Sequence, residues 1–209
     1  MPPLSPRLVR FSALCGMAAP LLFGFTVGIL GSLRPGYSHA SQMMSELGET
    51  GAPLAPAMNL LGLAGTGILM VLFSPGLRDG LGRTRAATAG SLLVAGAGIL
   101  YLVMAAFSCD PGCIATTPAG AIHMVAGLLA TVVAILSAFV IGYALRGQEG
   151  WEAYSVYSLV TGVLVLATLP VFLSAGASAG AWQRVLVGLL FLWMEVIALR
   201  LFLFASGAR

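Results

Sequence analysis

Six apolar segments, each longer than 20 residues, restrict most strongly what this chain can fold into. They cover approximately residues 11–33, 55–76, 86–107, 121–145, 154–174 and 185–205. An α-helix of about 20 residues crosses the hydrocarbon core of a bilayer. Because backbone polar groups must be satisfied internally in hydrocarbon, each segment is predicted to be a transmembrane helix. The predicted fold class is an all-α bundle of six transmembrane helices, forming a single domain over residues 1–209.

The scarcity of charge supports a membrane location. Only 8% of the residues are charged, whereas a soluble domain has about 25%. Such a chain has too few polar groups to cover its own surface in water. The formal net charge is +3, and the ten basic residues are all scattered arginines. Nucleic acid is therefore not expected as a partner.

The arginines also predict an orientation. With the N-terminus in the cytoplasm, the inner side carries Arg7, Arg10, Arg78, Arg83, Arg85, Arg146, Arg200 and Arg209. The outer side carries only Arg34 and Arg184. The positive-inside rule then predicts a multi-pass protein of the cell inner membrane with both termini cytoplasmic. The first segment exceeds the apolar region of a signal peptide, which is about 7–15 residues, so we expect an uncleaved helix. A processed signal peptide is the alternative.

Glycine is abundant in the predicted spans. Gly24 and Gly28 form a GxxxG pattern in the first span, and "GLAGTG" and "GSLLVAGAG" follow in the second and third. Small residues let transmembrane helices approach closely. The pattern predicts tight helix packing within the bundle.

The connector "PGYSHASQMMSELGETGAP", residues 35–53, is unusually polar for this chain. Residues 37–47 contain no proline or glycine, which predicts a short helix along the outer surface. His39 and Glu46 are seven residues apart and would share one face of it, with Ser45 on the other. Such a segment can cover a cavity or bind a head group. The alternative is an ordinary solvated loop.

A second outer loop contains "CDPGC". We predict a disulfide between Cys109 and Cys113, because Pro-Gly can close a tight loop and this side is oxidising. Asp110 would cap the following turn or point into the mouth of the bundle. His123 lies at the outer start of the fourth span, and Asn59 lies one turn into the second.

Several polar residues thus converge at one depth on the outer side of the membrane. Those predicted to line a polar pocket are His39, Glu46, Asn59, Asp110, His123 and Arg184. Such a set could act as an acid/base site or hold a metal. Two histidines are few for a metal site, so we assign no metal ligands and expect no cofactor. Trp182 would lie in the interfacial belt, and Arg184 would hold an anionic head group.

Glu195 stands apart because it lies in the middle of the sixth span. A charge there costs about 2.5–3.5 kcal/mol on the insertion scale. Glu195 is therefore expected to be protonated or paired inside the bundle. A proton or cation site is the functional interpretation, and a structural hydrogen bond is the alternative.

Three motifs together resemble a known family. They are "PGYSH…SELGETGAP…N", "CDPGC" before His123, and "QR…W…ALRL" in the last span. This combination resembles the bacterial membrane proteins called domain of unknown function 998, which implies six transmembrane helices and no assigned activity. "SELGETGAP" is also similar to the first loop of a eukaryotic six-helix family. That family includes a lipid-remodelling factor for GPI anchors and autophagy-linked membrane proteins, which implies a connection with lipids.

The predicted function is to bind or to modify by acid/base chemistry a lipid or isoprenoid-like substrate. Glu46 or Asp110 would be the proton donor or base, tuned by His39 and His123, with Ser45, Asn59, Trp182 and Arg184 binding substrate. An intramembrane isoprenoid cyclase is one concrete form, since protonation of an alkene requires an acid above an apolar cavity. The alternative is a transporter or partner subunit that uses Glu195. The expected partners are membrane lipids and a small hydrophobic substrate.

Overall fold

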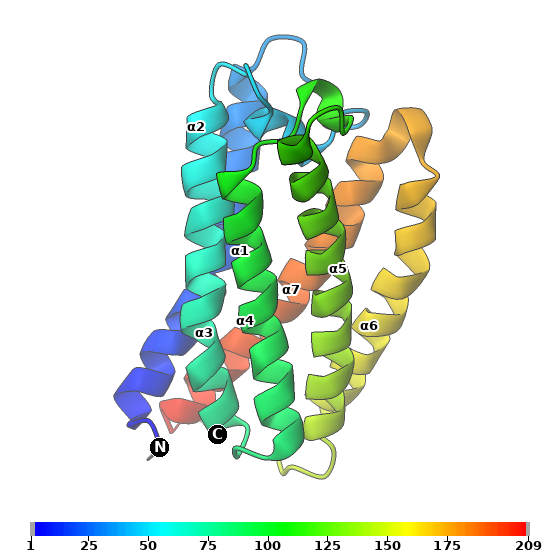
Figure 1. The fold of residues 1–209 in the computed structure, drawn as a ribbon. Helices are drawn as coiled ribbons and strands as arrows, with labels where there is room; N and C mark the ends of the chain where they lie inside the picture. Colours follow the sequence, from blue (N-terminus) through cyan, green and yellow to red (C-terminus); the bar gives the residue numbers. More distant parts are fainter. Residues whose placement is uncertain (1–2, 208–209) are drawn as a thin grey trace.

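The computed structural model describes residues 3–207, which form helices joined by short connections (Figure 1). The long helices are α1 (Pro6–Leu33), α3 (Thr66–Gly80), α4 (Arg85–Ala106), α5 (Pro118–Ala144), α6 (Glu152–Leu173) and α7 (Ala179–Ala205). The short elements are η1 (Met44–Gly48), α2 (Ala55–Ala57), η2 (Met58–Gly65), η3 (Pro111–Cys113) and η4 (Gly176–Ser178). Here η2 is a π-helical stretch, and the other η elements are 3₁₀ turns.

The six predicted transmembrane helices are confirmed. The elements α2, η2 and α3 form one continuous span, Ala55–Gly80, and each of the other long helices is apolar enough to cross a membrane. The largest differences from the predicted bounds lie at two N-termini. α1 begins at Pro6, because the Ser5 hydroxyl caps it by accepting from the Leu8 backbone N–H. α7 begins at Ala179, because η4 leads directly into it.

The six spans form a closed ring. Each packs against the next in the chain, and α7 returns to pack against α1. Two loops cover one end of this ring, and we call them together the cap: residues 34–54, which contain η1, and residues 107–117, which contain η3. The described ends of the chain lie together at the opposite end, the terminal end (Figure 1).

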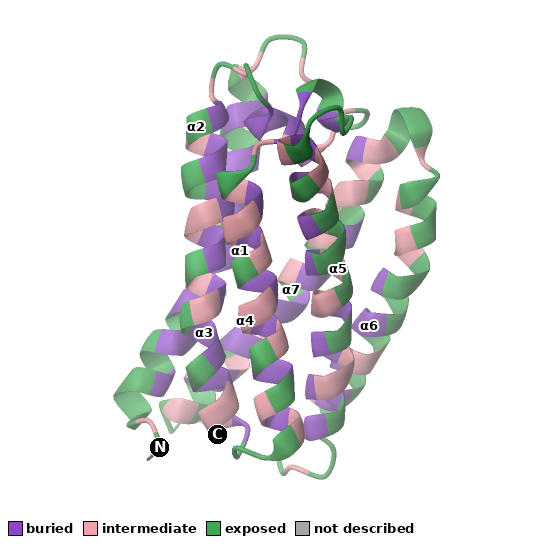
Figure 2. Ribbon diagram, viewed as in Figure 1, coloured by how far each residue is buried: buried purple, intermediate pink, exposed green. Residues whose placement is uncertain are grey.

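Burial in the ring suits a lipid environment. Long apolar side chains point outward, and Phe25, Leu60 and Leu92 are 67%, 68% and 64% exposed. Figure 2 shows exposed residues running along the outer faces of the helices, with buried residues between them. In water this surface would be unfavourable, whereas lipid tails solvate it. The burial pattern therefore agrees with the six-helix membrane architecture.

Glycine packing is confirmed between helices such as α3 and α4, but it is absent at the predicted GxxxG pair. A Cβ built on Gly67 would lie 2.5 Å from the carbonyl oxygen of Gly98, so the α3 and α4 backbones are in direct contact. In contrast, Gly24 and Gly28 have no atom within 4 Å of such a Cβ. The prediction that these two glycines mediate packing within the bundle is wrong, because that face of α1 points out of the ring.

Candidate functional site

A cavity of about 340 Å³ lies inside the ring, beneath the cap. All six spans contribute to its wall, and Met43, Met44 and Ser45 of the connector contribute at the cap end. Its wall is mostly apolar and includes seven of the nine methionines of the chain. Methionine is flexible and polarisable, and it recurs on surfaces that accommodate ligands of different shape. The volume lies within the range of small-molecule pockets, about 300–1,000 Å³.

The cavity opens sideways between α5 and α6. Val125 and Leu128 of α5 and Leu173 of α6 line the cavity, and they are also 58%, 46% and 64% exposed on the outer surface. The cap-end halves of these two helices diverge in Figure 1. A side chain that belongs to both the cavity wall and the outer surface marks an opening. This opening faces the lipid rather than the water at either end.

His123 brings an unpaired polar atom to this apolar wall. It lies in the first turns of α5 and is 1% exposed. Its Nδ1 lies 2.8 Å from the carbonyl oxygen of Phe107 and 3.1 Å from that of Met104. Its Nε2 is buried and has no hydrogen-bond partner among residues 3–207. His123 also lines the cavity, so among the predicted acid/base residues it is the one in contact with the apolar space.

Glu46 folds back onto the connector. Its Oε1 accepts from the Met43 backbone N–H at 2.7 Å, and its Oε2 accepts from the Gln42 amide at 2.8 Å. This self-capping produces the 3₁₀ turn η1 in place of the predicted helix over 37–47, so that prediction is wrong. His39 lies outside η1, in the turn before it.

The Arg184 side chain, on α7, contacts the His39 side chain of the connector. One terminal nitrogen of Arg184 donates to the carbonyl oxygens of Gln42 and Gly180, at 2.9 and 2.8 Å. The other donates to the Tyr37 hydroxyl at 2.6 Å and lies 3.0 Å from His39 Nδ1. Arg184 thus ties α7 to the connector. Its terminal N–H groups are used within the chain.

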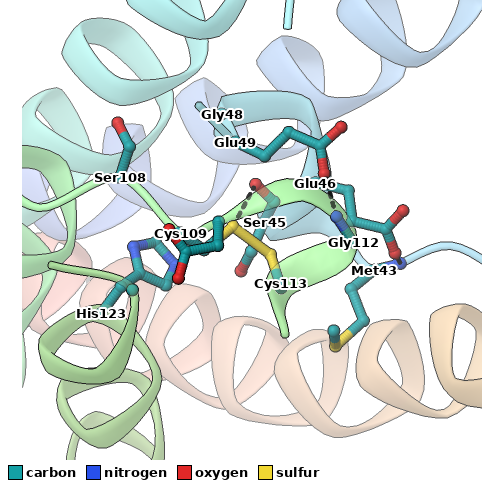
Figure 3. Close-up of a disulfide and its surroundings, with 12 residues drawn as sticks. Met43, Ser45, Glu46, Gly48, Glu49, Ser108, Cys109, Gly112, Cys113 and His123 are labelled. Atoms are coloured by element: carbon teal, nitrogen blue, oxygen red, sulfur yellow. Dashed lines mark hydrogen bonds between the residues drawn. A yellow bond between two sulfur atoms is a disulfide. The ribbon is translucent and has the colours of Figure 1, made fainter. Parts of the chain in front are cut away.

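The second loop is held by the predicted disulfide and by Asp110. Cys109 and Cys113 are bonded, which confirms the pairing, and the carbonyl oxygen of Ser45 lies 3.5 Å from Cys109 Sγ (Figure 3). Asp110 accepts from the Thr117 backbone N–H at 2.7 Å, from its hydroxyl at 2.8 Å, and from the Thr116 N–H at 2.7 Å. These bonds, first of all that from the Thr117 backbone, lower the Asp110 pKa to about 2.

Glu49 links the two loops of the cap, and the prediction from sequence missed it. Its Oε1 pairs with Arg34 at 2.6 Å, and its Oε2 accepts from the Gly112 N–H at 2.6 Å (Figure 3). The Thr50 N–H donates to the carbonyl oxygen of Cys109 at 2.8 Å beside them. The sequence did contain a signal for this ion pair. Arg34 is the one arginine beside the connector, and the connector contains two carboxylates, Glu46 and Glu49, either of which could pair with it.

The remaining predicted residues lie at the edges of the cavity or beyond it. Asn59 donates to the carbonyl oxygen of Gly48 and to the Ser108 hydroxyl, at 3.1 and 2.8 Å, so it ties η2 to both loops of the cap. Trp182 is 37% exposed at the start of α7. Glu195 is half-buried on α7, and its Oε2 has no partner in the described part of the chain.

The predicted residues are thus brought to one end of the molecule without lining one polar pocket. Of the six residues expected to do so, His123 lines the cavity and the other five do not. Ser45, predicted to bind substrate, also lines the cavity, and its role stays a prediction. No group of three potential metal-ligating side chains occurs within residues 3–207.

The fold and this cavity define a polytopic α-helical membrane protein with a ligand-sized apolar chamber closed by a hydrogen-bonded cap. The chain belongs to the family described as protein of unknown function DUF998, whose family model matches residues 17–200. That match covers the cap and most of the ring. Neither a curated protein nor a solved structure matches the chain.

Proposed function

We propose that this protein binds a lipid-like or isoprenoid-like molecule in the cavity inside its helix ring. The observation that carries the proposal is the chamber itself, about 340 Å³, walled by methionine and other apolar side chains and open to the side. Water gains little in such a space, because it needs two to four polar partners. An apolar chain gains dispersion contacts with the whole wall. The opening between α5 and α6 gives it a route from the bilayer.

The chemistry of the cap favours binding over proton donation by a carboxylic acid. The low pKa of Asp110 keeps its carboxylate ionised at neutral pH, which does not suit an acid that must protonate an alkene. Both oxygens of Glu46 accept hydrogen bonds from the connector itself. These carboxylates hold the cap in place over the chamber. Any proton-transfer step would fall to His123, which lines the cavity.

The transport alternative has less support. Glu195 does not line this cavity, and it lies between the exposed residues Leu192 and Leu199 on α7. A carboxyl group that moves a proton or cation through the ring would be expected to face the interior. The cavity and Glu195 are therefore not arranged as one pathway.

We also infer that the cap faces the outside of the cell and that the membrane is the inner membrane. Within residues 3–207, seven of the nine arginines belong to the terminal end or to the loops there, as the positive-inside rule requires. The disulfide lies in the cap, and disulfides persist on the oxidising side of a membrane.

Photo-crosslinking in isolated membranes tests the binding proposal. A long-chain lipid probe carrying a diazirine is activated by light, and the labelled residues are mapped by mass spectrometry. We expect labelling of Met124 and Met194, which line the cavity, and we expect excess unlabelled lipid to remove it. Leu92 and Leu199, which face outward, serve as the reference for non-saturable labelling by bulk lipid. Labelling confined to such outward residues would count against the proposal.

A further inference from the structure

The polar groups on the cavity wall indicate what the head group of the ligand must be. We propose that the ligand is an uncharged amphiphile whose hydroxyl group donates a hydrogen bond to His123 Nε2. The inference rests on the proposed binding function and adds the chemical class of the ligand. It depends on the tautomer of His123, on the burial of its free nitrogen, and on the charge of the surrounding wall.

The tautomer of His123 follows from its neighbours. Both groups within hydrogen-bond distance of Nδ1 are backbone carbonyls, those of Phe107 and Met104. A carbonyl oxygen only accepts, so Nδ1 must carry the hydrogen. In the neutral ring Nε2 is then an acceptor. An imidazolium would place a second donor, and a charge, without a partner in the same buried position.

The Nε2 atom of His123 lacks, within residues 3–207, the hydrogen-bond partner that a buried polar atom normally has. Nε2 is buried, has no partner in the described chain, and belongs to a side chain that is 1% exposed. Buried polar atoms are normally paired, and an unpaired one is costly. A ligand that donates a hydrogen bond here removes this penalty, whereas a purely apolar ligand or an acceptor leaves it in place. The site therefore selects for a donor.

The charge of the wall excludes an ionised head group. Within residues 3–207, no arginine, aspartate or glutamate lines the cavity; the wall is apolar except for a few neutral polar side chains. A phosphate or carboxylate would lose its hydration there without gaining a counter-ion. The nearby cap residues Arg34 and Glu49 already pair with each other. A neutral hydroxyl meets the need for a donor without this cost.

Gln183 supplies the complementary group. It lines the cavity, and its Oε1 accepts from the Met44 backbone N–H at 2.7 Å. Because the Met44 backbone N–H is a donor, the atom of the Gln183 amide that it contacts must be the oxygen. The NH₂ group of Gln183 can therefore donate to a ligand. A hydroxyl is both a donor and an acceptor, so its chemistry matches the acceptor on His123 and the donor on Gln183.

The length of the cavity sets the kind of tail. Ser137 lines the same cavity from the same helix as His123, fourteen residues further along α5. At 1.5 Å per residue the two positions are about 21 Å apart along the helix axis. The chamber therefore extends deep into the ring from the cap. It suits a single long apolar chain with its hydroxyl at the cap end.

A comparison of three head groups on one tail tests the inference. The probes are hexadecan-1-ol, its methyl ether and hexadecanoate, at equal mole fractions in detergent micelles with the full-length protein. Apparent Kd values are measured by native mass spectrometry. We expect the alcohol to bind about tenfold more tightly than the ether, the difference expected for one buried hydrogen bond. Hexadecanoate should bind more weakly than the alcohol.

The variant His123→Asn isolates the free nitrogen. The asparagine amide can still donate to the carbonyls of Phe107 and Met104, while the group at the position of Nε2 is lost. We expect the alcohol and the ether to bind this variant equally, with the ether unchanged from wild type. Thr168→Val is the control, because the hydroxyl of Thr168 already bonds the Leu164 carbonyl oxygen on the outer side of α6. It should keep the tenfold preference.

The outcomes separate this inference from the proposed function. If the wild-type protein binds the alcohol and the ether equally, the chamber binds lipid but His123 does not accept a hydrogen bond from the hydroxyl. The inference is then overturned. Tighter binding of hexadecanoate than of the alcohol overturns it also. If no probe binds, the proposed function fails together with it. The wild-type comparison remains decisive even if His123→Asn does not fold.

Discussion

At the scale of single residues, the polar side chains of the cap differ in whether their polar atoms are already bonded. Glu46, Glu49, Asp110 and Arg184 are bonded to backbone groups and to other side chains of the cap, such as Arg34 and Gln42. Among the predicted catalytic residues, His123 alone lines the cavity, and its buried Nε2 has no partner within residues 3–207. Except for Glu49, which the prediction missed, these residues were predictable from sequence as a group, because polar residues near span ends on one side must share a depth. Their bonding was not, because it depends on the path of two loops.

The first prediction concerns the pH dependence of the cap. The pKa of Asp110 is about 2 in the folded protein and about 3.9 in an unfolded chain. Its contribution to stability is therefore fully present above about pH 4, and it is lost as the pH falls toward 2. We expect the thermal unfolding midpoint of the wild-type protein to fall over this window more steeply than that of Asp110→Asn. Parallel curves for the two proteins would show that Asp110 does not stabilise the fold.

At the scale of elements, hydropathy identified the spans but not their contacts. All six helices were predicted from runs of apolar residues, and their ends moved most at the N-termini of α1, which Ser5 caps, and of α7, which η4 precedes. The glycine pattern was a poorer guide. A GxxxG pair predicts close approach to some surface, and in α1 that surface is not another helix of this chain. The helix predicted over 37–47 failed because the Glu46 side chain closed a tighter turn.

The second prediction compares two helix glycines. Gly67→Ala should destabilise the protein by about 1–3 kcal/mol, because the new methyl group meets the Gly98 carbonyl oxygen between α3 and α4. Gly28→Ala is the matched control, since its methyl group meets no atom and alanine favours the helix by up to about 1 kcal/mol. Unfolding in mild detergent measures both. Equal stability of the two variants would mean that the α3–α4 contact is not as close as described.

At the scale of the whole molecule, the sequence indicated a bundle with a pocket at its outer end, but it did not indicate which residues line the apolar chamber. The seven methionines of the wall are spread from residue 43 to residue 194, and no local spacing marks them as neighbours. They meet because the connector and four of the spans fold around one cavity. The one signal of a chamber in the sequence was the abundance of methionine in a chain with a polar outer connector. That signal did not indicate where in the bundle the chamber lies.

The third prediction concerns orientation in the membrane. Ser41 lies exposed in the cap, and Glu149 lies exposed in the loop between α5 and α6 at the terminal end. In intact spheroplasts, a membrane-impermeant maleimide should label Ser41→Cys and spare Glu149→Cys until the membrane is permeabilised. The wild-type protein gives the background from Cys15, which is buried. The reverse labelling pattern would place the cap in the cytoplasm.

The central claim, that the chamber holds a lipid-like molecule, is tested most directly by filling it. Ala130 is 4% exposed and lines the cavity, whereas Ala167 is exposed on the outer face of α6. The measurement is the amount of lipid-like molecule per chain that survives purification, quantified by mass spectrometry for Ala130→Phe and Ala167→Phe. We predict roughly one bound molecule in Ala167→Phe and at least about a tenfold loss in Ala130→Phe, because close-packed interiors leave no room for both occupants. Equal amounts in two well-folded variants would contradict the claim.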